Sequence, residues 1–402
     1  MYLEIPRKFN PIIHQARQVA REVFRPISRK YDRAEHAYPK ELDMFASIMD
    51  GMNDGAADGG AGAGKLARSG GSQDTGNANG TNMKTVLGLT ELCWGDVGLA
   101  LSIPRQGLGN SAIAAVANEE QLERLGNTWA AMAITEPGAG SDSGAIRTTA
   151  TKDGDDYIIN GEKIYITAGE WADAIVVWAS LDRSKGKAAI KSFVVEKGTP
   201  GMTLERLEKK LGIRSSDTAA VRFENCRVPK ENLLGSPEIS VDKGFAGAMQ
   251  TFDNTRPVVA GMAIGVARAA LEKTREILGK SGLDLSYHTQ TWTQPAVTRE
   301  LQLLEAELEA ARLLTIKAAW MADNGLPNSK EASMAKAKAG RVGNAITLRC
   351  VELCGSLGYS ETELLEKWAR DSKILDIFEG TQQIQLLIIA RRLLGKSSAE
   401  LK

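Results

Sequence analysis

Acid-base chemistry has few candidates in this sequence. The three histidines, His14, His36 and His288, stand in no recognisable motif, so any proton transfer would fall to a carboxylate. The candidate is Glu379, which lies in the segment 376–385 (DIFEGTQQIQ), directly before an apolar run. An acidic residue at that place is also what an ordinary helix start carries, because the amino end of a helix attracts negative charge. Glu379 therefore needs support from elsewhere in the chain.

Chain length and charge limit the classes of protein to which this sequence can belong. The chain has 402 residues, of which 43% are hydrophobic and 25% charged, enough for two or three domains with a substantial core. Lys plus Arg and Asp plus Glu both total 50, so no bulk charge favours nucleic acid or an acidic membrane surface. We expect no nucleic-acid partner, and a polyanionic ligand would have to be bound locally.

The four cysteines bear on compartment and metal binding. Cys93, Cys226, Cys350 and Cys354 have neither the density nor the spacing of a disulfide framework, which fits a reducing compartment. Cys350 and Cys354 could share a helix face, but no second pair completes a metal site, so we expect no metal. The start, MYLEIPRKFNP, lacks an apolar signal-peptide core, and no run of about 18 apolar residues occurs. The sequence predicts a cytoplasmic protein without membrane insertion.

The elements that must position Glu379 begin with helices. Residues 12–31 and 40–52 each predict an amphipathic helix, and helical spacing returns in residues 82–117. Between them, from about residue 51 to 82, the chain is rich in glycine and small polar residues, and we expect a mobile loop or disorder. The segment 59–65 (GGAGAGK) matches the start of a P-loop, but Leu66 occupies the Ser/Thr position and no apolar strand precedes it. We interpret this match as a coincidence of low complexity.

A turn-rich segment of small residues follows. In residues 129–145 (WAAMAITEPGAGSDSGA) a strand-like run, 130–135, opens into a stretch where small residues let the backbone approach a ligand closely. The glycines Gly138, Gly140 and Gly144 do not have the GxGxxG spacing, and no helix pattern follows. A Rossmann dinucleotide site is therefore disfavoured.

The hydrophobic period then changes twice. Residues 145–235 carry Asp-Gly and Asn-Gly turn signals between short alternating runs, with further strands predicted at 174–179, 190–196 and 219–223. From about residue 242 to the end the spacing is helical. The layout is helical, then all-β, then helical, and the fold class is α+β.

Two long motifs in this layout resemble a known family. Residues 133–145 (AITEPGAGSDSGA) resemble the first signature of the acyl-CoA dehydrogenase family at every specified position, and residues 354–371 (CGSLGYSETELLEKWARD) resemble the second with departures. Their order and the segment 252–257 (FDNTRP) agree with that family, and the resemblance covers nearly the whole chain outside the Gly-rich tract. It implies an N-terminal helical domain (1–128), a middle β-barrel-like domain (129–240) and a C-terminal four-helix-bundle-like domain (241–402).

The resemblance also implies a cofactor and a set of site residues. The cofactor is FAD, and the reaction is insertion of an α,β double bond into an acyl-CoA thioester. The segment 163–169 (KIYITAG) resembles the family's KxWITNG element, with Tyr165 in place of the Trp over the flavin ring. Carried over position by position, the residues expected at the cofactor are Met132, Ile134, Thr135, Gly140, Ser141, Tyr165, Thr167, Thr381 and Gln383, and those expected at the substrate are Ser141, Asp253, Arg256 and Gly380.

Glu379 is the catalytic base that the resemblance implies. Some family members place their catalytic Glu at the position that Thr255 occupies here, which leaves Glu379 for the task. Since a thioester α-proton is only weakly acidic, the base must be aligned with it and shielded from water. Burial beside a flavin would raise the pKa of Glu379 and make it a stronger base. In the family the backbone N–H of the base also donates to the thioester carbonyl as enolate character develops.

The departures from the family cluster in one place. The family's Arg-x-x-Phe-Gly element is missing from residues 279–295, and the second signature has Glu352 for the usual Gln, Ser356 for the second Gly, and Thr362 at an acidic or amide position. In the family this region reaches the FAD of a neighbouring subunit, so Glu352, Gly355 and Ser356 are candidates for that contact. Both a homotetramer and an α2β2 heterotetramer with a homologous subunit remain open.

Three functions remain open. The leading hypothesis is an acyl-CoA dehydrogenase that forms the trans-2-enoyl-CoA and passes electrons to an electron-transfer flavoprotein. The alternatives are an acyl-CoA oxidase and a non-catalytic or half-site subunit of a heteromeric acyl-CoA dehydrogenase. A chain of 402 residues without an extra C-terminal domain favours the dehydrogenase over the oxidase.

Overall fold

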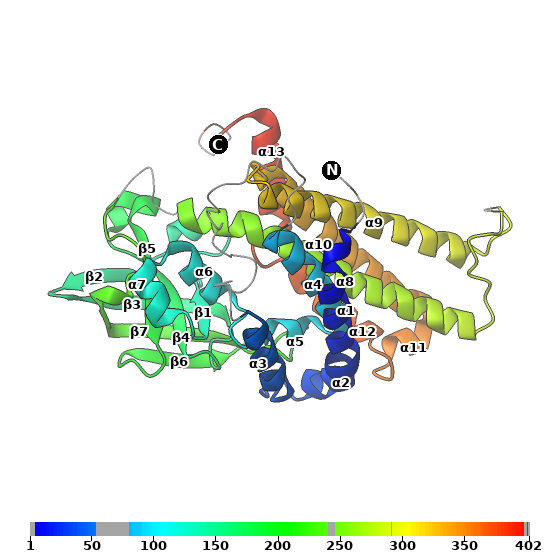
Figure 1. Ribbon diagram of the computed structural model, residues 1–402, viewed down its shortest axis with the longest axis horizontal. Coiled ribbons are helices and arrows are strands. Elements are labelled where there is room, and N and C mark those ends of the chain that lie inside the picture. The colour runs from blue at the N-terminus through cyan, green and yellow to red at the C-terminus, as the bar shows by residue number, and fades with distance from the viewer. Residues whose placement is uncertain (1–4, 54–79, 240–245, 291, 398–399, 401–402) are drawn as a thin grey trace.

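The computed structural model describes residues 5–53, 80–239, 246–290, 292–397 and 400, and the side chains of these residues except 48–53 and 246–254. Most of the Gly-rich tract, with its P-loop-like segment 59–65, lies outside the described residues. Within them, long helices occupy one side of the molecule and a sheet the other (Figure 1). This arrangement confirms the predicted α+β fold class.

Helices form the first part of the chain, as predicted. The helix expected over 12–31 is α1, a π-helical turn (Ala20–Phe24) and α2 in succession, because each piece ends in right-handed helical backbone that the next one continues. Asn118 and Gln121 form a reciprocal capping box that starts α7. The bounds are α1 Asn10–Val19, α2 Arg25–Arg33, α3 Glu41–Asn53, α4 Thr81–Gly95, α5 Val97–Leu101, α6 Leu108–Val116 and α7 Glu119–Leu125.

The middle of the chain forms one curled sheet of seven strands. The strand order is β1-β4-β2-β3-β7-β6, with β5 paired to β4, and β1 lies parallel to β4. All of β4 is buried, which explains its continuous apolar sequence. The strands predicted at 174–179, 190–196 and 219–223 are present. The bounds are β1 Ala130–Ala133, β2 Thr149–Asp153, β3 Asp156–Thr167, β4 Ala174–Ser180, β5 Ile190–Glu196, β6 Met202–Leu207 and β7 Thr218–Pro229.

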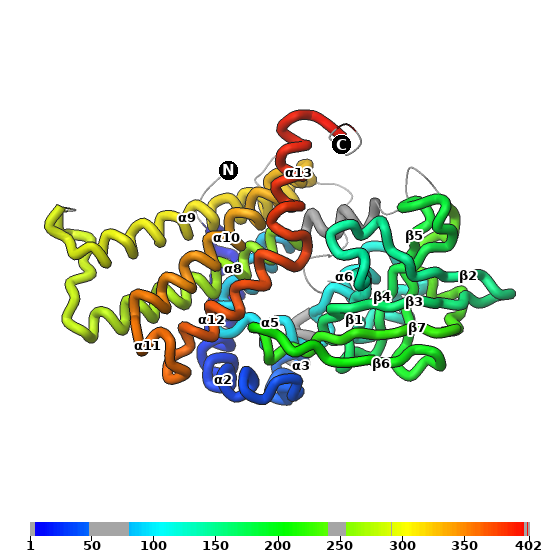
Figure 2. The backbone as a smooth tube through the Cα atoms, turned by 180° about the vertical axis from the view of Figure 1, so that it is seen from behind, coloured from blue at the N-terminus to red at the C-terminus, as the bar shows by residue number. Residues whose placement is uncertain are grey.

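Long helices form the last part of the chain. Glycine allows close packing between α4 and α8, because a Cβ at Gly265 would lie 2.2 Å from the Thr90 carbonyl oxygen. Seen from behind, α13 stands at the boundary between the long helices and the sheet (Figure 2). The bounds are α8 Ala246–Lys280, α9 Ala296–Asp323, α10 Ser329–Leu353, α11 Gly355–Tyr359, α12 Leu365–Ser372 and α13 Gln382–Leu394, with a 3-10 helix at Lys373–Asp376.

A fully buried ionic cluster joins the three parts. Lys367 on α12 lies 2.7 Å from Asp96, which caps α5, and 2.5 Å from Asp371. Asp371 in turn accepts a hydrogen bond of 2.6 Å from the backbone N–H of Ile213, in the loop between β6 and β7. Because a buried charge is stable only with its partners, this cluster fixes the turn before α13 relative to the sheet.

Candidate active site

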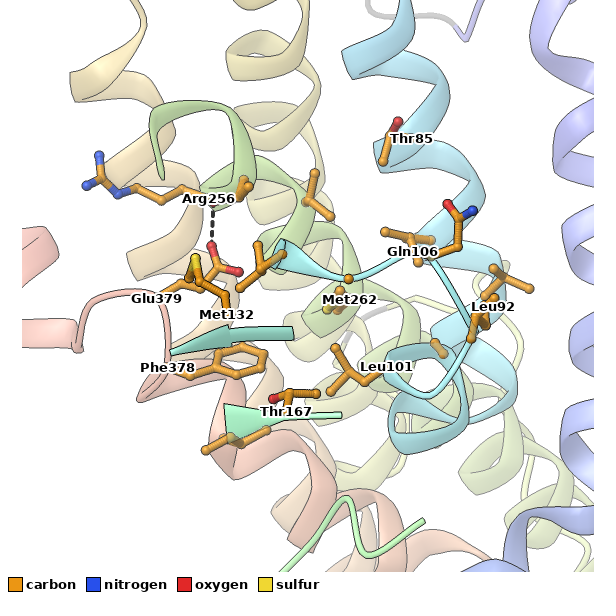
Figure 3. Close-up of a pocket in the computed structure, with 18 of the residues that line it drawn as sticks. Thr85, Leu92, Leu101, Gln106, Met132, Thr167, Arg256, Met262, Phe378 and Glu379 are labelled. Atoms are coloured by element: carbon orange, nitrogen blue, oxygen red, sulfur yellow. Dashed lines mark hydrogen bonds between the residues drawn. The ribbon is translucent and has the colours of Figure 1, made fainter. Parts of the chain in front are cut away.

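A cavity of about 1770 Å³ lies where the sheet meets the helices. Its wall comes from β1, β3, α4, α8 and the turn before α13, and most of its lining is apolar. Figure 3 shows Glu379 at one end of this wall, beside Met132 and Phe378, and Thr85 and Gln106 at the other. A carboxylate thus faces a space large enough for sizeable ligands.

Most of the predicted site residues meet at this cavity, although they come from four separate stretches of the chain. Gln383 is instead exposed on α13 and does not line the cavity. Glu352, Gly355 and Ser356, at the end of α10 and the start of α11, lie outside it too. Asp253 belongs to α8, but its side chain is outside the described residues. The lining residues are Met132, Ile134, Thr135, Gly140, Ser141, Tyr165, Thr167, Arg256, Glu379, Gly380 and Thr381.

Glu379 has an unusual backbone conformation. Its φ is 54° and that of the next residue, Gly380, is 92°. The left-handed region costs a residue with a side chain roughly 1–2 kcal/mol, and such strain gathers at functional sites. Immediately afterwards the Thr381 side chain accepts a hydrogen bond from the Ile384 backbone N–H and caps α13. The turn therefore presents the Glu379 carboxylate to the cavity just before the helix begins.

The Glu379 carboxylate has one direct hydrogen-bond donor among the described side chains. Thr255 Oγ1 donates to Glu379 Oε2 over 2.5 Å, the dashed line of Figure 3. Burial raises the pKa of Glu379, while this hydrogen bond and the charges of Lys336 and Arg256 oppose the rise. Thr255, which the sequence identifies only as the position where some family members carry their catalytic Glu, is thus a hydrogen-bond partner of Glu379. Arg256 lies in the cavity wall but is only 6% exposed.

Two residues that sequence reasoning missed hold the turn from behind. Lys336 on α10 is fully buried, and its Nζ donates to the Gly380 carbonyl oxygen over 2.6 Å. Gln385 on α13, also fully buried, donates to the carbonyl oxygens of Glu379 and Gly380 over 3.2 and 3.1 Å. A signal for Lys336 existed in the sequence, because a lysine interrupts the alanine-rich face of a helix at that position.

The opposite wall is held by another buried lysine. Glu136 accepts hydrogen bonds from the backbone N–H groups of Arg147 and Thr148 and from the Thr148 hydroxyl. Lys163 on β3 reaches the same carboxylate over 2.8 Å and the Ile134 carbonyl oxygen over 3.1 Å. Burial lowers the pKa of Lys163 to about 8. These contacts pin the loop of residues 134–148 onto the sheet. We call it the flavin-side loop, because the family resemblance predicts flavin contacts there.

The flavin-side loop and β3 leave room for a flat ligand. A Cβ placed on Gly138 or Gly140 would meet no atom within 4 Å, so these glycines border open space. Tyr165 is 63% exposed with a φ of 57°, at a point where the register between β3 and β7 shifts. An exposed aromatic ring beside a cavity offers a stacking surface.

The comparisons with known proteins agree on one family. The family models "Acyl-CoA dehydrogenase, middle domain" and "Acyl-CoA dehydrogenase, C-terminal domain" match residues 131–226 and 242–394. "Acyl-CoA dehydrogenase, short-chain specific" of Clostridium acetobutylicum is 36% identical over 336 residues, which cover 80% of this chain and 85% of that protein. The chain belongs to the acyl-CoA dehydrogenase family.

Two further members show how far the similarity extends. "Short-chain specific acyl-CoA dehydrogenase, mitochondrial" of Mus musculus is 42% identical over 67% of this chain, and the chain covers 64% of the mouse protein's length. The structure of butyryl-CoA dehydrogenase from Megasphaera elsdenii superposes with a TM-score of 0.82 at 32% identity, over 98% of this chain and 100% of that one. The arrangement of the helices and the sheet is thus that of the family.

Acyl-CoA dehydrogenases use FAD, and the lining residues fit such a cofactor. Gly140 lets the backbone approach a ligand closely, and Thr135, Ser141 and Thr167 bring hydroxyl groups to the same wall. Tyr165 adds the exposed ring. The cavity wall that faces Glu379 thus has the chemistry that a flavin requires.

The described residues contain neither a metal-binding cluster nor a membrane-spanning helix. No group of three or more His, Cys, Asp or Glu side chains in this part of the chain is placed to hold a metal ion. No helix that the structure describes is both long and apolar enough to cross a membrane. The four cysteines are free and buried.

Proposed function

We propose that this chain is an acyl-CoA dehydrogenase that converts a saturated acyl-CoA thioester to the trans-2-enoyl-CoA. The observation that carries the proposal is the Glu379 carboxylate, which lines the same cavity as the flavin-side loop and accepts a hydrogen bond from Thr255. When bound, FAD supplies the acceptor for the β-hydrogen, which leaves with its electron pair. Glu379 takes the α-proton on its carboxylate, and the electrons of that C–H bond become the new double bond.

The residues around Glu379 prepare it for this step. Burial makes its carboxylate more basic, while the Thr255 hydroxyl fixes its orientation. The Glu379 backbone N–H is the proposed donor to the thioester carbonyl. Ser141, Arg256 and Gly380 lie along the same cavity and are the proposed substrate contacts, together with Asp253. The apolar residues Leu92, Leu101 and Met262 line the cavity and suit an acyl chain.

The direct test is anaerobic addition of an acyl-CoA to the flavin-loaded protein. Relatives are named as short-chain specific, so butyryl-CoA is the first substrate to try, followed by longer and branched acyl-CoAs. We expect the substrate to bleach the flavin absorbance, and Glu379→Gln to abolish bleaching while FAD stays bound. The exposed Glu309, paired with Arg312, gives a matched control, because Glu309→Gln makes the same chemical change at a residue that does not line this cavity.

Three outcomes would change the assignment. Bleaching of Glu379→Gln at the wild-type rate would remove Glu379 from the role of base. Rapid reoxidation of the bleached flavin by air would favour an oxidase over a dehydrogenase that uses an electron-transfer flavoprotein. A chain that never bleaches with any acyl-CoA would favour the non-catalytic subunit.

The proposed assembly is a homotetramer or an α2β2 heterotetramer in the cytoplasm. Leu386, Leu387, Leu393 and Leu394 leave α13 with an exposed apolar side, which supports contact with another subunit. Glu352, the candidate for the neighbour's cofactor, is ion-paired with Arg349 of its own helix. Full flavin content in a homotetramer of the purified chain would exclude the need for a second kind of subunit.

A further inference from the structure

The turn that carries Glu379 needs support from its surroundings. Glu379 and Gly380 are consecutive residues with left-handed φ values of 54° and 92°. Strained backbone of this kind persists only where neighbouring groups determine it. The carbonyl oxygens of both residues accept hydrogen bonds from fully buried side chains. Gln385 donates to both oxygens, and Lys336 donates to that of Gly380.

Lys336 buries a charged side chain, which is energetically unfavourable. It is fully buried on α10, between the buried Ala335 and Ala337, where an unpaired charge would be strongly unfavourable. Its Nζ binds the Gly380 carbonyl oxygen. Burial lowers the pKa of Lys336 to about 8, the charges of Asp376 and Glu379 oppose this change, and Arg256 adds to it. A group with that pKa is still mostly protonated at pH 7, so it brings a positive charge to the back of the turn.

Gln385 completes the support from the other side. It lies one helical turn into α13, and its Nε2 lies within hydrogen-bond distance of two successive carbonyl oxygens. A Cβ at Gly380 would lie 2.5 Å from the same Nε2, so the amide can approach only because that residue is glycine. The turn, the glycine and the amide are therefore complementary in shape.

We propose that Lys336 and Gln385 are positioning residues for the base: together they hold the Glu379–Gly380 turn, and the positive charge of Lys336 favours the carboxylate form of Glu379. This inference rests on the proposed function of Glu379. Neither side chain lines the cavity, so both act through the turn rather than on a ligand. Gln385 contributes geometry alone, whereas Lys336 contributes geometry and charge.

Several groups around Glu379 affect its ionisation, so the test must separate the effect of Lys336 from that of the others. From α8, Thr255 donates to the carboxylate and Arg256 adds a positive charge, and from α10, Lys336 adds another. Asp376, on the 3-10 helix before the turn, acts on Lys336. Loss of Lys336 therefore leaves Arg256 as the remaining described cation that favours the carboxylate form.

The first experiment measures the rate of flavin reduction by butyryl-CoA against pH in the FAD-loaded protein. Lys336→Met should move the midpoint of the profile upward by about one pH unit, because a nearby positive charge has been removed. Lys336→Arg should keep the wild-type midpoint, and the affinity for the acyl-CoA should change little in either variant. Lys338→Met is the control, since Lys338 is a half-buried lysine of the same helix that pairs with Glu307 on α9 and does not contact the turn. An unchanged midpoint in Lys336→Met would overturn the role of its charge.

The second variant isolates geometry. Gln385→Leu removes both amide hydrogen bonds without changing any charge, so we expect reduction to slow about tenfold with the pH midpoint in place. Wild-type reduction by Gln385→Leu would overturn its positioning role.

A third measurement does not depend on activity. The melting temperature of Glu379→Gln minus that of the parent, followed against pH, reports the pKa of Glu379. The pKa of Glu379 is raised in the folded state, so the parent loses stability as the pH rises from the pKa of Glu379 in the unfolded chain to its pKa in the folded protein. Above the folded-state pKa, the difference in melting temperature no longer changes. In the Lys336→Met background the levelling should occur at higher pH. If no acyl-CoA reduces the wild type, the proposed function fails, while this measurement still decides the inference.

Discussion

Two segments of the cavity wall are each held by a buried lysine, but the two lysines differ in their partners. Lys163 and Lys336 are both fully buried, and each donates to a backbone carbonyl of a segment that faces the cavity, at Ile134 and Gly380. Lys163 also forms an ion pair of 2.8 Å with Glu136. Lys336 has no carboxylate at ion-pair distance within the described part of the chain. The charge of Lys163 is neutralised by Glu136, whereas the charge of Lys336 remains available to act on Glu379.

This difference separates a structural lysine from one that also serves the chemistry. The Glu136 carboxylate has four described hydrogen-bond donors, so the flavin-side loop is fixed by groups that do not change during a reaction. The turn of Glu379 is held by neutral carbonyl contacts, which leave the carboxylate itself free to gain a proton.

The largest effect is expected on the flavin-side wall. Glu136→Leu leaves Lys163 buried without its carboxylate, and unfolding free energy should fall by about 3–5 kcal/mol, with loss of bound FAD. The double variant Glu136→Leu/Lys163→Met should recover most of the lost stability. Chemical denaturation of the three proteins measures both values. A single variant as stable as wild type would mean that the ion pair does not fix this wall.

The next effect concerns the base directly. Thr255→Val removes the hydroxyl that donates to Glu379, a hydrogen bond to a charged group that contributes about 1.5–3 kcal/mol. Since the hydrogen bond lowers the pKa of Glu379, its loss should raise that pKa and move the rate profile for flavin reduction to higher pH. Stopped-flow reduction across pH is the measurement. Thr255→Ser, which keeps the hydroxyl, should behave like wild type.

A smaller effect is expected at the helix after the turn. Thr381 caps α13 through its side chain, and Thr381→Ala should lower unfolding free energy by about 1 kcal/mol. Thr381→Ser should restore it, because the hydroxyl oxygen is retained. Equal stability of the alanine and serine variants would show that the cap contributes nothing.

The smallest change in stability is expected for Lys336→Met. The variant loses one hydrogen bond but no longer buries a charge, so unfolding free energy at pH 7 should change by about 1 kcal/mol or less. Chemical denaturation at pH 7 checks this value. A loss as large as that of Glu136→Leu would remove the contrast between the two lysines.

The parts of the site that are contiguous in the chain could be predicted from the sequence. The segment 133–145 and Glu379 carry local motifs, and the buried strands carry continuous apolar runs. β6 was not predicted, because its residues are mostly exposed and show no apolar alternation. Lys336 was missed since its partner Gly380 lies 44 residues away, and only packing of α10 against the turn brings them together. Gln383, expected at the cofactor, faces solvent in this chain.

The buried cluster of Lys367, Asp96 and Asp371 has a consequence for biosynthesis. Asp96 leaves the ribosome 271 residues before Lys367 does. Until α12 has been translated, the nascent protein lacks the lysine that neutralises Asp96, so its N-terminal helices cannot close their core around that carboxylate. Completion of folding therefore waits for the segment that also delivers Glu379, and a prematurely terminated chain stays recognisable to proteases.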